Sequence, residues 1–138
     1  MYKALNFLSL ARQAGTAELG EEPAGAAARA GKAYVLLAAA DCSDHTWRRV
    51  KSFAAGTDQQ TVRLPYTKDE MGMAIGRSSL AMAAITDVSM ALALVKALPE
   101  QEKHAEVIAV LTQKVERQKQ RKKEAQAHKK NVRMGKKK

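Results

Sequence analysis

Two unbroken apolar segments, residues 33–40 and residues 80–85, constrain the fold of this chain more than any other feature. The first contains only alanine, tyrosine, valine and leucine, and the second contains only leucine, alanine, methionine and isoleucine before it ends at Thr86. Apolar runs of this length, bounded by turn residues, are typical of strands buried on both faces. Such strands require helices over both faces of their sheet.

The segments around these two runs alternate between helical and strand patterns. Residues 2–14 carry apolar side chains at helical spacing and stop at Gly15, and further helices are expected through residues 20–31, 43–56, 67–76 and 87–98. The helix at residue 67 begins with a capping-box pattern, Thr67 followed by Glu70. Residues 16–19 and 61–64 supply two more short strands. We therefore predict an α/β fold, a three-layer α/β/α sandwich around a small four-stranded mixed sheet.

The chain changes character near its end. After Pro99 a last helix places Val107, Ile108, Leu111 and Val115 near one face, and the apolar pattern then stops. The final twenty-five residues hold twelve basic and two acidic side chains, which accounts for the whole net charge of +10. We expect one domain over residues 1–99 and a C-terminal helix and basic tail over residues 100–138, with the final residues disordered.

A cationic segment of this density favours a polyanionic partner, nucleic acid above all. Adsorption to an anionic membrane is the alternative, but the tail beyond Val115 has no Trp, Phe or Leu to insert. We expect the tail to contact phosphates without sequence selectivity, through Lys119, Arg121, Lys122, Lys123, Lys129 and Lys130.

Several functional classes have little support in the sequence. Cys42 is the single cysteine, so neither an internal disulfide nor a cysteine-based zinc site is expected, and the start of the chain has no secretory pattern. We therefore expect a cytoplasmic protein without a metal or cofactor. The polar cluster at residues 41–45, which includes Cys42 and His45, is better explained as a helix cap than as a catalytic site. Trp47 either covers the core or stacks on a base, and the first role is the more common.

The order of the segments and several local motifs resemble the kink-turn RNA-binding ribosomal protein family of archaea and eukaryotes, and specifically its small bacterial YlxQ-type branch. The resemblance covers residues 2–98. The segments that carry it are residues 5–15, Gly20-Glu21-Glu22, Gly31-Lys32-Ala33, Asp41-Cys42-Ser43, residues 72–76 and residues 83–87.

This resemblance implies that one end of the sheet grips a sharply bent RNA. The contacts would come from the start of the second helix and from a loop before the last strand. In this sequence those positions are Gly20, Glu21, Glu22, Pro23 and Ala26, and Arg77, Ser78, Ser79 and Leu80; Lys32 is a further candidate. The chain departs from the family where Glu22, Pro23 and Ala26 replace an amide or basic residue, a polar residue and a lysine. Two carboxylates near a phosphate backbone repel it by about 1 kcal/mol each.

The sequence therefore favours a non-enzymatic RNA-binding, ribosomal-protein-like protein that recognises structured RNA, with ribosomal RNA and the ribosome as candidate partners. The alternative is a protein-interaction module that has lost specific RNA recognition. In that case Glu21 and Glu22 face a basic partner, the last helix docks through Val107, Ile108 and Leu111, and the tail is a general polyanion anchor. The oligomeric state does not follow from the sequence.

Overall fold

A four-stranded mixed sheet lies at the centre of the protein, in a computed structural model that describes residues 2–136, with side chains described up to residue 128. The strand order is β1-β4-β2-β3. The strands are β1 (Ala17–Leu19), β2 (Val35–Ala38), β3 (Gln60–Arg63) and β4 (Met82–Ile85). Strand β4 is antiparallel to both β1 and β2, whereas β2 and β3 are parallel. The predicted mixed sheet of four strands is confirmed.

The two central strands are β2 and β4, and all four residues of each are buried. Val35 pairs with Ile85 at one end of these strands, and Ala38 pairs with Met82 at the other. These strands are the two apolar runs of the sequence, and their residues are apolar on both sides because helices cover both faces of the sheet.

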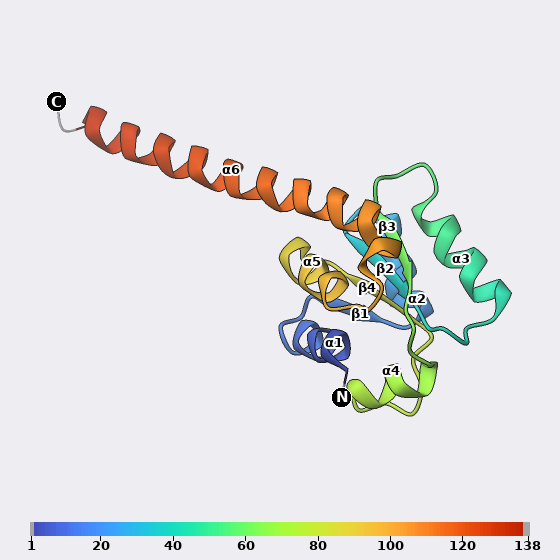
Figure 1. Ribbon diagram of the computed structural model, residues 1–138. Coiled ribbons are helices and arrows are strands. Elements are labelled where there is room, and N and C mark those ends of the chain that lie inside the picture. Colours follow the sequence, from blue (N-terminus) through green and yellow to red (C-terminus); the bar gives the residue numbers. More distant parts are fainter. Residues whose placement is uncertain (1, 137–138) are drawn as a thin grey trace.

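Helices α2 (Glu21–Arg29) and α3 (Asp44–Ala54) pack on one face of the sheet. Helices α1 (Lys3–Gln13) and α5 (Val88–Lys96) form the layer on the other face, and the short α4 (Lys68–Ala74) packs against α1 (Figure 1). The three-layer α/β/α arrangement expected from the sequence is therefore present.

Local capping determines where three of these helices begin. The Thr67 hydroxyl accepts from the Glu70 N–H, and the Glu70 carboxylate accepts from the Thr67 N–H, which is the predicted capping box. Ser43 accepts from the Thr46 N–H at the start of α3, and Asp87 accepts from the Met90 N–H at the start of α5. The residues that the sequence assigned to helix starts occupy those positions.

The last part of the chain contains a 3₁₀ turn, η1 (Gln101–His104), followed by one long helix, α6 (Ala105–Lys136). Helix α6 packs against α5 over its first turns and then extends away from the body (Figure 1). Leu111 and Val115 belong to the same hydrophobic core as the sheet, and Val107 and Ile108 pack against that core. Because Leu111 is 0% exposed, it serves the protein's own core and is not available to a docking partner.

The basic extension is thus helical through Lys136. The sequence predicts that the final residues are disordered. Residues 137–138 and the side chains of residues 129–138 lie outside the described part of the chain, so this stays a prediction for them. The division at residue 99 stays a prediction, although the first turns of α6 share the core of the preceding residues.

Candidate nucleic-acid interface

The start of α2 is one of the two places where candidate contact residues meet. Gly20 follows β1 and precedes α2 with a φ of 102°, a conformation that glycine adopts far more readily than other residues. No side chain caps the helix at this point, and Glu21 and Glu22 are exposed in its first turn. The first N–H groups of a helix have no partner within the helix, so the N–H groups of Glu21 and Glu22 are available to an anion, whereas Pro23 has no N–H.

The carboxylate of Glu21 forms an ion pair with Arg49 of α3. The Arg49 guanidinium also lies over the Phe53 ring, 5.3 Å from its centroid, and Arg29 of α2 lies 5.9 Å from the same centroid. Gly25 permits this close approach of α2 and α3, because a Cβ at its position would lie 2.8 Å from the Phe53 ring. The negative charge at the start of α2 is therefore partly neutralised by a residue from another helix. Arg49 was not among the predicted contact residues.

The loop of residues 77–79 is the second part of this surface. Its side chains are exposed, while its backbone folds closely over α4: the Arg77 N–H donates to the Gly72 carbonyl at 2.8 Å. The Leu80 N–H then donates to the Lys68 carbonyl at 2.9 Å. Leu80 is only 3% exposed, so it packs in the core and does not meet a base as the resemblance implied.

A backbone hydrogen bond between the end of β1 and the start of β4 indicates that these two segments lie at the same end of the sheet. The Gly20 N–H donates to the carbonyl of Met82 at 2.8 Å, and Met82 begins β4 shortly after the 77–79 loop. Gly20, Glu21, Glu22, Arg77, Ser78 and Ser79 therefore lie at the same end of the sheet. We call these six residues the α2–loop surface.

Lys32 lies at the opposite end of the sheet from the α2–loop surface. It follows the C-terminus of α2, and its N–H donates to the Ala27 carbonyl at 2.9 Å. The next residues lead into β2 at the end where Val35 pairs with Ile85, while the α2–loop surface lies at the end where Ala38 pairs with Met82. Lys32 is exposed, but it cannot share one contact surface with Gly20 and Arg77. The role of Lys32 as an RNA contact stays a prediction, and it would concern a separate surface.

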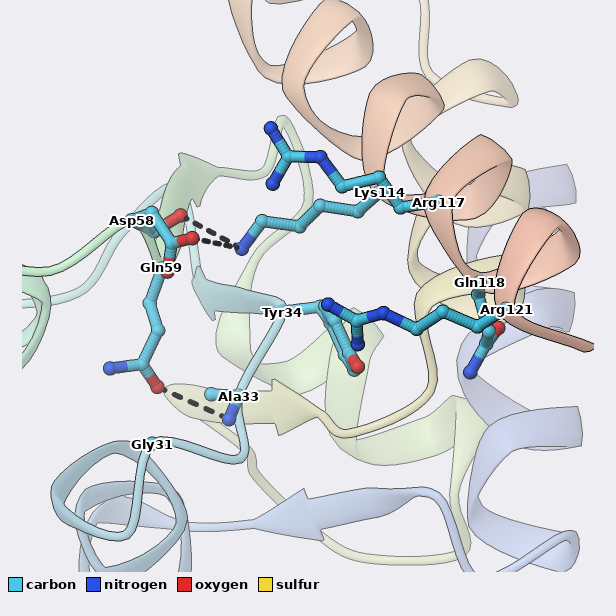
Figure 2. Close-up of a pocket in the computed structure, with 9 residues that line it drawn as sticks. All are labelled: Gly31, Ala33, Tyr34, Asp58, Gln59, Lys114, Arg117, Gln118 and Arg121. Carbon is cyan, nitrogen blue, oxygen red and sulfur yellow. Dashed lines mark hydrogen bonds and ion pairs between the residues drawn. The ribbon is translucent and has the colours of Figure 1, made fainter. Parts of the chain in front are cut away.

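A cleft of about 270 Å³ lies beside Lys32, between the base of the exposed part of α6 and the ends of β2 and β3. Figure 2 shows the residues that line it, Gly31, Ala33, Tyr34, Asp58, Gln59, Lys114, Arg117, Gln118 and Arg121. We call it the α6 cleft. Of these residues, only Arg121 was singled out from the sequence. The other lining residues were not predicted as contacts, because the sequence of the basic tail does not indicate where α6 meets the sheet.

Lys114 fastens α6 to the sheet at this cleft. Its ammonium lies 3.0 Å from the Asp58 carboxylate, 3.3 Å from the Asp58 carbonyl and 5.5 Å from the centroid of the Tyr34 ring. Hydrogen bonding and charge attraction from Lys114 hold the pKa of Asp58 below its usual range. The Lys114 side chain is only 15% exposed, so this cation serves the structure of the protein rather than a partner.

The remaining tail candidates lie along the exposed part of α6. Lys119, Arg121, Lys122 and Lys123 are exposed, and Lys119 makes a long ion pair with Glu116 at 3.9 Å. The backbone of Lys129 and Lys130 continues the helix, but their side chains lie outside the described residues.

The polar cluster at residues 41–45 has structural roles. The Asp41 carboxylate accepts from the Lys68 N–H at 2.8 Å, Ser43 caps α3, and Cys42 is buried. Trp47 packs against the core, with Lys51 and Arg63 each 5.7 Å from its ring centroid.

The described residues contain no group of three or more His, Cys, Asp and Glu side chains placed to hold a metal ion. Within that same part of the chain, no helix is both long and apolar enough to cross a membrane.

Comparison with known proteins gives a likeness in structure only. No protein-family model and no curated protein sequence matches the chain. A protein of unknown function from Bacillus halodurans superposes with a TM-score of 0.67 at 21% identity, over 72% of this chain and 100% of the other. The 15.5kD RNA binding protein of Giardia lamblia superposes with a TM-score of 0.57 at 18% identity, over 72% of this chain and 84% of the other. At these identities the comparisons establish that the chain shares its fold with these two proteins.

Proposed function

We propose that this protein is a non-enzymatic RNA-binding protein that recognises structured, kink-turn-like RNA with its α2–loop surface. Helix α6 supplies additional electrostatic attraction. A cytoplasmic location and association with ribosomal RNA belong to the same proposal. The shared fold with an RNA binding protein of Giardia lamblia supports RNA as the partner.

The observation that carries the proposal is the hydrogen bond between the Gly20 N–H and the Met82 carbonyl. It fixes an uncapped helix N-terminus at the end of the sheet from which β4 begins, a few residues after an exposed loop that contains Arg77, Ser78 and Ser79. Backbone N–H groups, a guanidinium and hydroxyl groups are the donors that nucleic-acid-binding proteins direct at phosphates and base edges. A rigid pair of such segments can recognise the shape of an RNA as well as its charge.

The ion pair between Glu21 and Arg49 reduces the repulsion between this surface and RNA phosphates. An unpaired carboxylate a few ångströms from a phosphate costs about 1 kcal/mol in a water-like medium. Because Arg49 pairs with Glu21, Glu22 is the one of these two glutamates whose charge is not compensated by an ion pair with a described residue. Glu22 can then accept hydrogen bonds from the amino groups of bases.

The basic side chains of α6 would act differently from the α2–loop surface. Each phosphate that they neutralise contributes about −0.9 to the slope of log K against log salt on a duplex, and about −0.7 on a single strand. This attraction does not depend on sequence, so α6 would raise affinity while the α2–loop surface provides selectivity.

The test compares a kink-turn RNA with the same RNA after its sheared G·A pairs have been changed to Watson–Crick pairs. We expect the full chain to prefer the kink-turn by at least tenfold, which corresponds to about 1.4 kcal/mol. A variant with Lys119, Lys122, Lys123, Lys129 and Lys130 changed to Gln should bind both RNAs more weakly and keep the preference. Equal binding of the two RNAs would contradict shape recognition and leave a general polyanion anchor.

Arg77 provides the matched test of the surface itself. Arg77→Gln should reduce the preference for the kink-turn, because it removes a cation from the 77–79 loop. Arg12→Gln is the control, since Arg12 is also exposed but lies near the end of α1, at the other end of the sheet. An equal effect of both substitutions on both RNAs would exclude a selective role for Arg77.

A further inference from the structure

The α6 cleft combines two exposed arginines with a polar floor at the end of the sheet opposite to the α2–loop surface. Arg117 and Arg121 lie one helical turn apart on α6, and Figure 2 shows both side chains extending from the helix over the cleft. Neither arginine forms a salt bridge with any described residue. Both guanidinium groups are therefore free to bind an anion.

The other charged groups of the cleft are already paired with each other. Asp58 is the carboxylate of the cleft and would repel an anion, but Lys114 compensates its charge at 3.0 Å. The Asp58 side chain is 74% exposed, so solvent also screens it. The net charge of the lining residues is consequently that of Arg117 and Arg121.

The floor of the cleft is fixed in place. Gln59 is buried, its Oε1 accepts from the Ala33 N–H at 3.1 Å, and its Nε2 donates to the Ala28 carbonyl at 3.1 Å. The Lys114 ammonium over the Tyr34 ring holds α6 against the same turn. The two arginines therefore project over a preformed surface. This lowers the entropic cost of binding an anion, because the floor of the cleft does not have to become ordered.

The position of the cleft favours an extended polyanion. Lys114, Arg117, Gln118 and Arg121 line it from successive turns of α6, and exposed basic side chains follow at Lys122 and Lys123. Successive turns of the helix place Arg117 and Arg121 about 6 Å apart along its axis, so the two can hold one phosphate or two neighbouring ones. Arginine can bind a phosphate through two parallel N–H···O bonds, which lysine cannot do.

We infer that the α6 cleft is a second RNA-contact site, in which Arg117 and Arg121 hold a phosphodiester backbone against the turn formed by Gly31 and Tyr34. This inference rests on the proposed RNA-binding function and adds to it. The first exposed turns of α6 then bind RNA at a defined position. The protein contacts two separate stretches of RNA backbone, one at each end of its sheet.

The test uses two double variants of the full chain with equal loss of charge. Arg117→Gln/Arg121→Gln removes the cations of the cleft. Lys119→Gln/Lys123→Gln removes two cations from the same turns of α6. Lys119 and Lys123 each lie two residues after one of the arginines, which corresponds to a rotation of about 200° and places them on the opposite face of the helix. All four side chains are exposed, so both variants should fold, and thermal unfolding checks this.

We expect the cleft variant to bind the kink-turn RNA at least tenfold more weakly than the wild-type chain, and the control variant about twofold to threefold more weakly. The salt slope should fall by about 1.4 to 1.8 in the cleft variant, as for two lost phosphate contacts. Arg117→Lys/Arg121→Lys keeps the charge but not the bidentate geometry, and should restore only part of the loss. Equal weakening in the cleft and control variants would overturn the inference.

The preference for kink-turn over Watson–Crick RNA separates this inference from the proposed function. The cleft variant should keep that preference, because its α2–loop surface is unchanged. If the wild-type chain shows no preference, shape recognition fails, yet the comparison of the two double variants on either RNA still decides whether the cleft exists as a site.

A titration with a short oligouridylate gives a direct readout of the cleft. The backbone resonance of Gly31 and the side-chain amide resonance of Gln118 should shift in the wild-type spectrum, and these shifts should disappear in Arg117→Gln/Arg121→Gln. Unchanged Gly31 and Gln118 resonances at saturating oligonucleotide would overturn the inference.

Discussion

Gly72 is the residue on which the conformation of the 77–79 loop depends most directly. A Cβ built on Gly72 would lie 2.6 Å from the Ser79 nitrogen, 2.7 Å from the Ser79 Cα and 2.8 Å from the Arg77 carbonyl oxygen. All three are backbone atoms, so no side-chain rotation can relieve the contact. Gly72→Ala must therefore push the loop away from α4 by roughly 0.9 Å to reach a normal separation of about 3.5 Å.

The free energy of unfolding should reflect two opposing effects of this substitution. Overpacking of this kind costs about 1–3 kcal/mol, and the backbone contacts place Gly72 toward the upper part of that range. Alanine inside a helix recovers about 1 kcal/mol relative to glycine. We expect a net loss of about 1–2 kcal/mol, measured by urea unfolding, together with a lower preference for the kink-turn RNA because the loop has moved.

Met73→Ala is the control for this prediction. Met73 is the next residue of the same helix and is 77% exposed, so its truncation should change the free energy of unfolding by less than about 0.5 kcal/mol. The reasoning is refuted if Gly72→Ala is as stable as the wild-type chain and binds the kink-turn RNA with unchanged preference.

Three further predictions concern contacts between distant parts of the chain. Leu111→Ala should lower the free energy of unfolding by about 2–4 kcal/mol, because this fully buried side chain joins α6 to the core; a loss below 1 kcal/mol in urea unfolding would mean that α6 is not part of the core. Arg49→Gln should weaken RNA binding by about threefold to tenfold, since an uncompensated Glu21 repels phosphate, and adding Glu21→Gln should restore binding; no rescue in a filter-binding assay would contradict this role. Asp58→Asn should cost under about 1 kcal/mol of stability because the pair with Lys114 is largely solvent-screened. Since Lys114 lowers the pKa of Asp58 from 3.8, the stabilisation is complete above pH 3.8 and is lost as the pH falls through the lowered pKa. The urea midpoints of wild type and Asp58→Asn should therefore differ at pH 6, and the difference should shrink as the pH is lowered below 3.8; a constant difference would exclude this pair as the cause.

Much of the fold could be predicted from local patterns. The apolar runs became β2 and β4 because a strand covered on both faces needs apolar residues at every position. The capping box of Thr67 and Glu70 was readable because both partners lie within one helical turn. Helix starts and buried strands depend on neighbouring residues, so their information is local.

The candidate site was predicted less completely. Gly20 and Arg77 were expected at one surface, and their segments lie at the same end of the sheet. Lys32 was a further candidate, and only the structure shows that it lies at the other end of the sheet, because a list of positions carries no direction along the strands. Leu80 was expected to meet RNA but packs in the core, where its apolar side chain is removed from water.

The sequence alone therefore determined the α/β class, the alternation of elements and the concentration of positive charge at the C-terminal end, since each depends on neighbouring residues or on counts. Only the tertiary structure decided that Arg49 neutralises Glu21, that Lys114 pairs with Asp58 across more than fifty residues, and that Arg117 and Arg121 stand over a polar cleft. The physical reason is that these contacts form where separate elements pack together. The angle and register of that packing are set by the whole core and not by any one segment.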